Sequence, residues 1–235
     1  MRGLAQTDDP HPLQRRPEPH QTVHTPEAIW TSGAPGTHDH AMTNENGGPA
    51  KTFLILHGFQ NHRPPGHWQH WLAGRLRERG HEVRYPQLPS PDSPVLAEWL
   101  DALEEHGKRP ADGEFVVLAH SLSVLLWLRA GGRRPDADRV LLVAPPSPPV
   151  TASIPEIAAF ADGLDPTETG LAARLVYGDG DPYCPGGADL HYGRPLGLDT
   201  DRVPGGEHFT PADGYGDWPS VLEWCEDPSV RLRGR

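Results

Sequence analysis

The sequence predicts the α/β fold class, with a Rossmann-like parallel sheet flanked by helices. Three observations lead to this prediction. From residue 52 onward, short apolar runs alternate with segments whose apolar residues recur at helical spacing. The runs FLIL, FVVL and VLLVA are continuously apolar, as strands buried on both faces of a parallel sheet are. Segment 114–130, EFVVLAHSLSVLLWLRA, joins such a run to a helical pattern through a sharp turn that carries Ser121.

The first part of the predicted fold contains two strands and two helices. A strand is expected over 52–56 and another over 82–87. Between them, apolar residues at near-helical spacing predict a helix over 67–79, which ends at Gly80 because glycine suits a helix end. The residues Asp92-Ser93-Pro94 are expected to cap the helix that follows the second strand.

The second part begins with the segment around Ser121. Its strand covers 115–118, and its helix, from residue 122, is expected to end at Gly131-Gly132. The same criteria predict strands over 139–144, 172–177 and 200–203, and a final amphipathic helix over 218–225.

Composition narrows the classes of function. The 235 residues suit one α/β domain with a tail, and 28 prolines and 26 glycines indicate that part of the chain lies outside the core. A formal net charge of −11 argues against nucleic acid as a partner. The two cysteines, Cys184 and Cys225, cannot form a disulfide framework, and no apolar run approaches the roughly 20 residues that span a bilayer. We therefore expect a cytoplasmic protein without membrane insertion.

Three parts are expected along the chain. Residues 1–50 contain many prolines and five histidines, with apolar residues at no regular period, and are predicted to be a disordered N-terminal tail. The spacing of these histidines fits no tight coordination pattern, so a solvated tail is favoured over a metal-binding tract. Residues 51–228 are expected to form the α/β domain, and 229–235 a C-terminal tail.

The turn at Ser121 resembles a nucleophile elbow. In α/β-hydrolases this turn, G-x-S-x-G, lifts a serine hydroxyl above the carboxyl edge of the sheet, and small flanking residues let the backbones pack closely. Ala119 and Ser123 occupy the two glycine positions here. An ordinary serine turn is the alternative for the pentapeptide alone, but the strand and helix beside it favour Ser121 as a nucleophile.

A serine nucleophile requires a base and a buried acid, and in this fold class the chain order is serine, acid, histidine. Asp181 lies after the predicted strand 172–177, in GDGDPYCP. Asp179 on the same loop is the alternative acid. We prefer Asp181 because Pro182 fixes the bend directly after it.

Three histidines compete for the role of the base. His208 follows the last predicted strand, in GGEHF, and is preferred over His191, which lies in a glycine-rich segment. His120 is adjacent to Ser121. Because an elbow points the neighbours of its serine away from the substrate, His120 is interpreted as a packing residue.

Acyl transfer also needs an oxyanion hole, formed by two backbone N–H groups aimed at the developing negative charge. The N–H of Leu122 is expected to be one, because it follows the nucleophile at the start of a helix. The N–H of Phe59 is expected to be the other, because Gly58 lets the loop after the first strand approach closely. An ordinary glycine turn is the alternative for this loop.

Six segments carry a resemblance to a known family: FLILHGFQNHRPPGHWQHWL, YPQLPSPDSPVLAEWLDAL, VVLAHSLS, VLLVAPP, YGDGDPYCP and GGEHFTPADGYGDWPSVLEW. Together they resemble small α/β-hydrolases of the retinoblastoma-binding serine hydrolase type, over about residues 51–226. The resemblance implies a hydrolase domain with minimal or no cap, Ser121, Asp181 and His208 in the matching triad positions, and no cofactor or metal. Ser123 and the long N-terminal tail depart from the family pattern, and the L-x-C-x-E motif of some relatives is absent.

The sequence thus predicts a serine hydrolase that cleaves a small ester, thioester or amide, with a small-molecule acyl substrate as its partner. The alternatives are a non-catalytic interaction protein on a decayed hydrolase scaffold, and an acyltransferase. Segment 146–171 is proline-rich and is expected to form one short helix near 154–161, too little for a large cap. Acyl groups of about two to six carbons are therefore expected to be preferred, because longer chains would stay in water.

Overall fold

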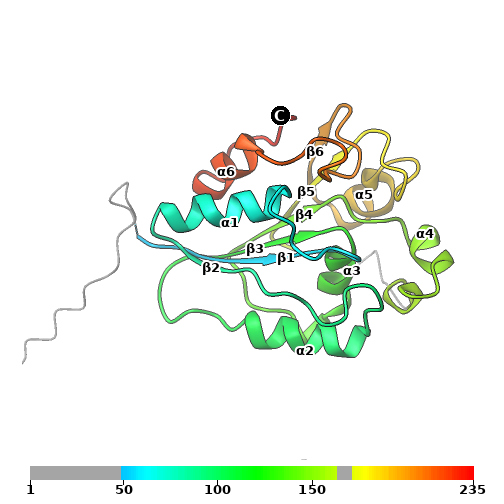
Figure 1. The fold of residues 1–235 in the computed structure, drawn as a ribbon, viewed down its shortest axis with the longest axis horizontal. Helices are drawn as coiled ribbons and strands as arrows, with labels where there is room; N and C mark the ends of the chain where they lie inside the picture. The colour runs from blue at the N-terminus through cyan, green and yellow to red at the C-terminus, as the bar shows by residue number, and fades with distance from the viewer. Residues whose placement is uncertain (1–48, 163–170) are drawn as a thin grey trace, which may run out of the picture. The chain divides into compact units, whose positions relative to one another are not determined.

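The computed structural model describes residues 49–162 and 171–235. These residues contain a six-stranded sheet in which every neighbouring pair is parallel, in the order β2-β1-β3-β4-β5-β6 (Figure 1). The strands are β1 Thr52–Leu56, β2 Glu82–Arg84, β3 Phe115–His120, β4 Arg139–Val143, β5 Ala173–Gly178 and β6 Asp199–Val203. The predicted fold class is confirmed. All but the last two residues of the predicted N-terminal tail lie outside the described part.

Helices cover both faces of the sheet. The α-helices are α1 Trp68–Glu78, α2 Leu96–His106, α3 Leu122–Arg129, α4 Pro148–Ser153, α5 Arg194–Leu196 and α6 Pro219–Glu226. Short 3-10 turns lie at η1 Gly131–Arg133 and η2 Ala158–Phe160, and a π-turn at η3 Asp189–Gly193. Helices α1 and α6 lie on one face, and α2 and α3 on the other (Figure 1).

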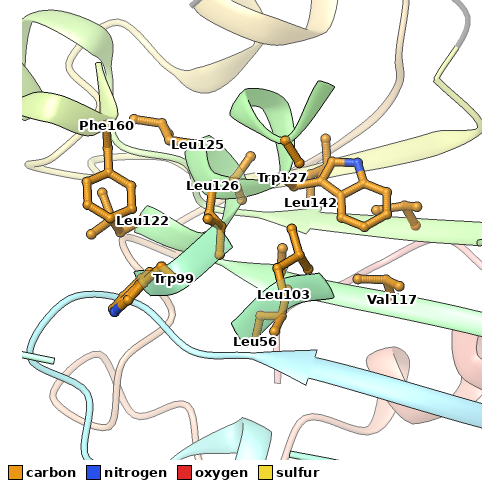
Figure 2. Close-up of a cluster of buried hydrophobic side chains, with 14 of the residues drawn as sticks. Leu56, Trp99, Leu103, Val117, Leu122, Leu125, Leu126, Trp127, Leu142 and Phe160 are labelled. Carbon is orange, nitrogen blue, oxygen red and sulfur yellow. The ribbon is translucent and has the colours of Figure 1, made fainter. Parts of the chain in front are cut away.

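Alternation along each strand divides the core between these faces. In β1, Leu54 and Leu56 pack with Trp99 of α2 and with α3, whereas Phe53 and Ile55 pack with α1 and α6. Figure 2 shows the first cluster, in which the side chains of α2, α3 and η2 meet over the sheet. The ring centroids of Trp99 and Phe160 are 5.3 Å apart, so η2 is fixed against α2.

The largest differences from the prediction lie at three elements. Strand β2 ends at Arg84 because the next backbone carbonyl, that of Tyr85, accepts a hydrogen bond from Arg63. Helix α2 begins after Val95, so the predicted cap at 92–94 is wrong. Two short elements, α4 and η2, replace the single helix predicted over 154–161, because Ser147 caps α4 by accepting the N–H of Val150.

The last residues of the chain are held against the domain. Residues 229–235 form no helix or strand, but Leu232 is buried and its N–H donates to Asp201 of β6 over 3.0 Å. The carbonyl of Arg233 accepts from the Trp218 indole at 2.6 Å and from the Ser220 hydroxyl at 2.9 Å. The predicted C-terminal tail is therefore a docked segment. Across 49–162 and 171–235, no helix combines the length and apolarity that crossing a bilayer requires.

Candidate active site

Ser121 stands at the carboxyl edge of the sheet, between the end of β3 and the start of α3. Its φ of 58° and ψ of −124° lie outside the usual regions for a residue with a side chain. Its N–H donates to the Val143 carbonyl at 2.8 Å, which extends the pairing of β3 with β4 and holds the turn. A strained backbone fixed in this way is typical of a functional turn.

The three predicted triad side chains lie in one hydrogen-bonded chain. The Oγ of Ser121 is 2.9 Å from the Nε2 of His208, and the Nδ1 of His208 is 2.8 Å from Oδ2 of Asp181. Asp181 and His208 are both buried, and the second oxygen of Asp181 accepts the N–H of Tyr183 at 2.8 Å. This arrangement provides an acid that orients a base and a base that reaches a hydroxyl.

The alternative residues lie elsewhere. Asp179 pairs with Arg202 of β6 at 2.9 Å, and this partner lowers the pKa of the Asp179 carboxyl. His191 lies in η3, where its ring contacts Tyr192. The structure therefore brings Asp181 and His208 to Ser121, and leaves Asp179 and His191 outside the hydrogen-bonded chain.

Two glycines allow these segments to meet. A Cβ on Gly58 would lie 2.7 Å from the Cβ of Ser121, so a side chain there would collide with the elbow. A Cβ on Gly178, at the end of β5, would lie 2.3 Å from the backbone nitrogen of Glu207. The second close approach places the loop that carries His208 against the strand that leads to Asp181.

The predicted oxyanion donors both border a pocket of about 600 Å³ in front of Ser121. Among the described residues, the N–H groups of Phe59 and Leu122 have no hydrogen-bond acceptor. The loop that carries Phe59 is held by His57. The Nδ1–H of His57 donates to the Gly58 carbonyl at 2.8 Å, and its Nε2 accepts the N–H of Leu88 at 2.8 Å. The carbonyl of His57 accepts the Ser123 hydroxyl, so the serine at the second elbow position joins the two loops.

The pocket has an apolar and a polar wall. The apolar wall consists of Leu122, Pro146, Val150, Ile154 and Ile157, largely from the segment of α4 and η2. The polar wall consists of Gln60, Asn61, His62, His67 and Thr210. Tyr183 also borders the pocket, and its ring centroid lies 4.6 Å from that of His208.

Three buried histidines lie near the elbow and the pocket. Burial lowers the pKa of His57 and of His67 to about 4, and holds the pKa of His120 well below its ordinary range. His120 packs against the Trp68 ring, as expected of a packing residue, and its Nε2–H also donates to the His208 carbonyl at 3.0 Å. His208 therefore packs beside a neutral imidazole, that of His120.

Comparison with known proteins agrees with this geometry. The profile of the family described as "Serine hydrolase" matches residues 53–226. The chain belongs to the serine hydrolase family. This serine hydrolase is 24% identical to YdeN of Bacillus subtilis (strain 168) over 179 residues, which cover 74% of this chain and 93% of YdeN.

Solved structures share the fold of this serine hydrolase. The crystal structure of the B. subtilis ydeN gene product matches with a TM-score of 0.59 at 23% identity, over 75% of this chain and 97% of that one. A YdeN-like protein from Pectobacterium atrosepticum matches with a TM-score of 0.63 at 16% identity, over 75% of this chain and 90% of that one. These matches support the α/β-hydrolase fold.

Sequence reasoning missed two residues at the site of this serine hydrolase. His57 makes a hydrogen bond within the loop beside Ser121, and His67 borders the pocket. Neither residue lies in a sequence pattern that predicts such a position. The motif HGF suggested a role for Gly58 and Phe59 only, and no pattern linked His67 to the pocket.

Within the described ranges, no group of three or more His, Cys, Asp or Glu side chains is arranged to hold a metal ion.

Proposed function

We propose that this serine hydrolase cleaves a small ester, thioester or amide through an acyl-enzyme intermediate, with Ser121, His208 and Asp181 as its catalytic triad. One observation carries the proposal: the continuous hydrogen-bonded chain from Asp181 through His208 to Ser121, which ends at the pocket. An activated serine requires this order of contacts.

In the proposed first step, Nε2 of His208 takes the proton of Ser121 as Oγ attacks the acyl carbon. The carbonyl oxygen becomes an oxyanion, which the N–H groups of Phe59 and Leu122 stabilise. Collapse of this intermediate breaks the bond to the leaving group, which receives the proton from His208. Asp181 accepts a hydrogen bond from Nδ1 and stabilises the imidazolium.

In the second step, His208 takes a proton from water, whose oxygen attacks the acyl carbon of the acyl-enzyme. Collapse returns the proton to Ser121 and releases the carboxylic acid. An acceptor other than water would give acyl transfer from the same intermediate, so product analysis with an added alcohol separates hydrolysis from transfer.

The pocket supports a small acyl substrate. A volume of about 600 Å³ falls in the range of small-molecule sites. The apolar wall, with Val150, Ile154 and Ile157, suits a short hydrocarbon chain. We propose a carboxylesterase-like preference for acyl groups of about two to six carbons. Each methylene that is buried in the pocket adds about 0.8 kcal/mol to the free energy of binding, and the methylenes of a longer chain that stay in water add nothing. We also propose the retinoblastoma-binding type within the family, on the motifs quoted above.

Fluorophosphonate labelling tests the proposal, because the reagent reacts with an activated serine. We expect labelling and hydrolysis of short-chain esters by the native chain, and loss of both in Ser121→Ala. Ser93→Ala, at an exposed serine, is the matched control and should retain both. Labelling of Ser121→Ala at the native rate would refute the assignment. A folded native chain that neither reacts nor hydrolyses any ester would favour the non-catalytic interaction protein.

A further inference from the structure

His67 is a buried histidine at the border of the pocket that the proposed mechanism does not use. It is the N-cap of α1, and only 3% of its surface is exposed. It belongs to the polar wall, whereas the segment of α4 and η2 contributes to the apolar wall. Its ring centroid lies 5.3 Å from that of His120, which in turn lies 5.2 Å from that of His208.

The hydrogen bonds of His67 define which nitrogen carries its proton. Nδ1 accepts the N–H of Gln69 at 3.2 Å, so the proton of the neutral ring is on Nε2. Burial lowers the pKa of His67 to about 4, so this tautomer persists at neutral pH. Within 49–162 and 171–235, Nε2 has no hydrogen-bond partner, and it is not among the fully enclosed polar atoms. The open edge of the ring therefore presents an N–H donor to the pocket.

The neighbouring donors are already occupied. At the start of α1, the N–H of Trp68 donates to the Tyr215 carbonyl at 3.1 Å, and those of His70 and Trp71 donate to the His67 carbonyl at 3.0 and 3.2 Å. The hydroxyl of Thr210 donates to Asp213 at 2.8 Å. The start of α1 thus offers one neutral donor rather than an anion site, which suits an uncharged oxygen acceptor.

The position of His67 indicates which part of the substrate it meets. The leaving group takes its proton from Nε2 of His208 and so lies on the side of that ring. His67 and the His208 ring border the same pocket. The hydrocarbon part of the acyl group suits the apolar residues that line the pocket, which leaves the polar residues, His67 among them, for the leaving group.

We propose that His67 binds the leaving group of the substrate by donating its Nε2–H to an oxygen, so that the site selects esters of alcohols bearing a hydroxyl, ether or carbonyl oxygen. The inference rests on the proposed hydrolase function. Because the Nε2–H has no acceptor among the described residues, an oxygen of the leaving group can accept it without displacing another protein contact.

Two butyrate esters test this inference, because they share an acyl group and differ only in the hydroxyls of the leaving group: the glycerol monoester and the propyl ester. The readout is the ratio of their kcat/KM values. His67→Asn is the informative variant, since asparagine also caps a helix but places no donor at the position of Nε2. His67→Ser, a second capping residue, repeats the test. His70→Asn, at an exposed position of α1, is the control.

We expect the native chain and His70→Asn to favour the glycerol ester, and both His67 variants to lower the ratio by about tenfold, the effect of one lost hydrogen bond. An unchanged ratio in His67 variants that remain folded and react with fluorophosphonate would overturn this inference alone. A native chain that fails to react with fluorophosphonate would overturn the proposed function, and this inference with it.

Discussion

Replacement of Gly58 by alanine tests whether the loop after β1 must touch the elbow. The added Cβ would lie 2.7 Å from the Cβ of Ser121 and 3.1 Å from its Oγ, whereas ordinary contacts begin near 3.4 Å. Either the loop or the Ser121 side chain must therefore move by about 0.7 Å. Movement of the loop takes the N–H of Phe59 away from the oxyanion, and movement of Oγ stretches its 2.9 Å contact with His208 beyond hydrogen-bond length.

Loss of one oxyanion donor lowers kcat by about 10²–10³, and a displacement of about 1 Å in a site can cost about 10². We expect kcat/KM of Gly58→Ala for a short-chain p-nitrophenyl ester to fall by about 10², with slower fluorophosphonate labelling. Thermal melting establishes that the variant is folded at the assay temperature. Gly66→Ala is the control, because no atom lies within 4 Å of its added Cβ. Native-like kcat/KM in folded Gly58→Ala would refute the reasoning.

Three further perturbations probe the acid, the buried histidines and the C-terminus. Asp181→Asn should lower kcat by about 10⁴, whereas Asp179→Asn should have little effect; steady-state kinetics showing the reverse would make Asp179 the acid. The folded-state pKa of about 4 for His57 and His67 lies below the ordinary 6.5, so the free energy of unfolding should fall as pH falls from 6.5 to 4, by up to about 1.4 kcal/mol per pH unit for each. Denaturant unfolding that gives equal stability at the two ends of this window would contradict it. Deletion of 229–235 should cost about 3 kcal/mol or more, through exposure of the surface that Leu232 covers and loss of its hydrogen bonds; an unchanged melting temperature would show that the segment contributes nothing.

The sequence was sufficient to predict the parallel sheet and the three residues that lie together at its carboxyl edge. Buried parallel strands are continuously apolar, and the carboxyl ends of such strands meet at one edge, so residues after β3, β5 and β6 were expected together. Ser121, Asp181 and His208 follow these strands in the order that the fold class requires.

Local sequence patterns could not predict contacts between segments that are distant in the chain. Asp179 and Asp181 share one loop, and the pairing that separates them comes from Arg202 on the next strand. The early end of β2 depends on Arg63, 22 residues before the carbonyl that it binds. The orientation of the His67 ring depends on its place as the cap of α1, which the sequence pattern did not reveal.

The central claim is that Ser121 is an activated nucleophile, so the reactivity of its hydroxyl is the property to measure. Peptide mapping by mass spectrometry, after reaction of the native chain with fluorophosphonate, measures it directly. The hydrogen-bonded chain from Asp181 to Ser121 predicts a single adduct, on the peptide that contains Ser121. An adduct on another residue, or steady ester hydrolysis while Ser121 remains unmodified, would contradict the account.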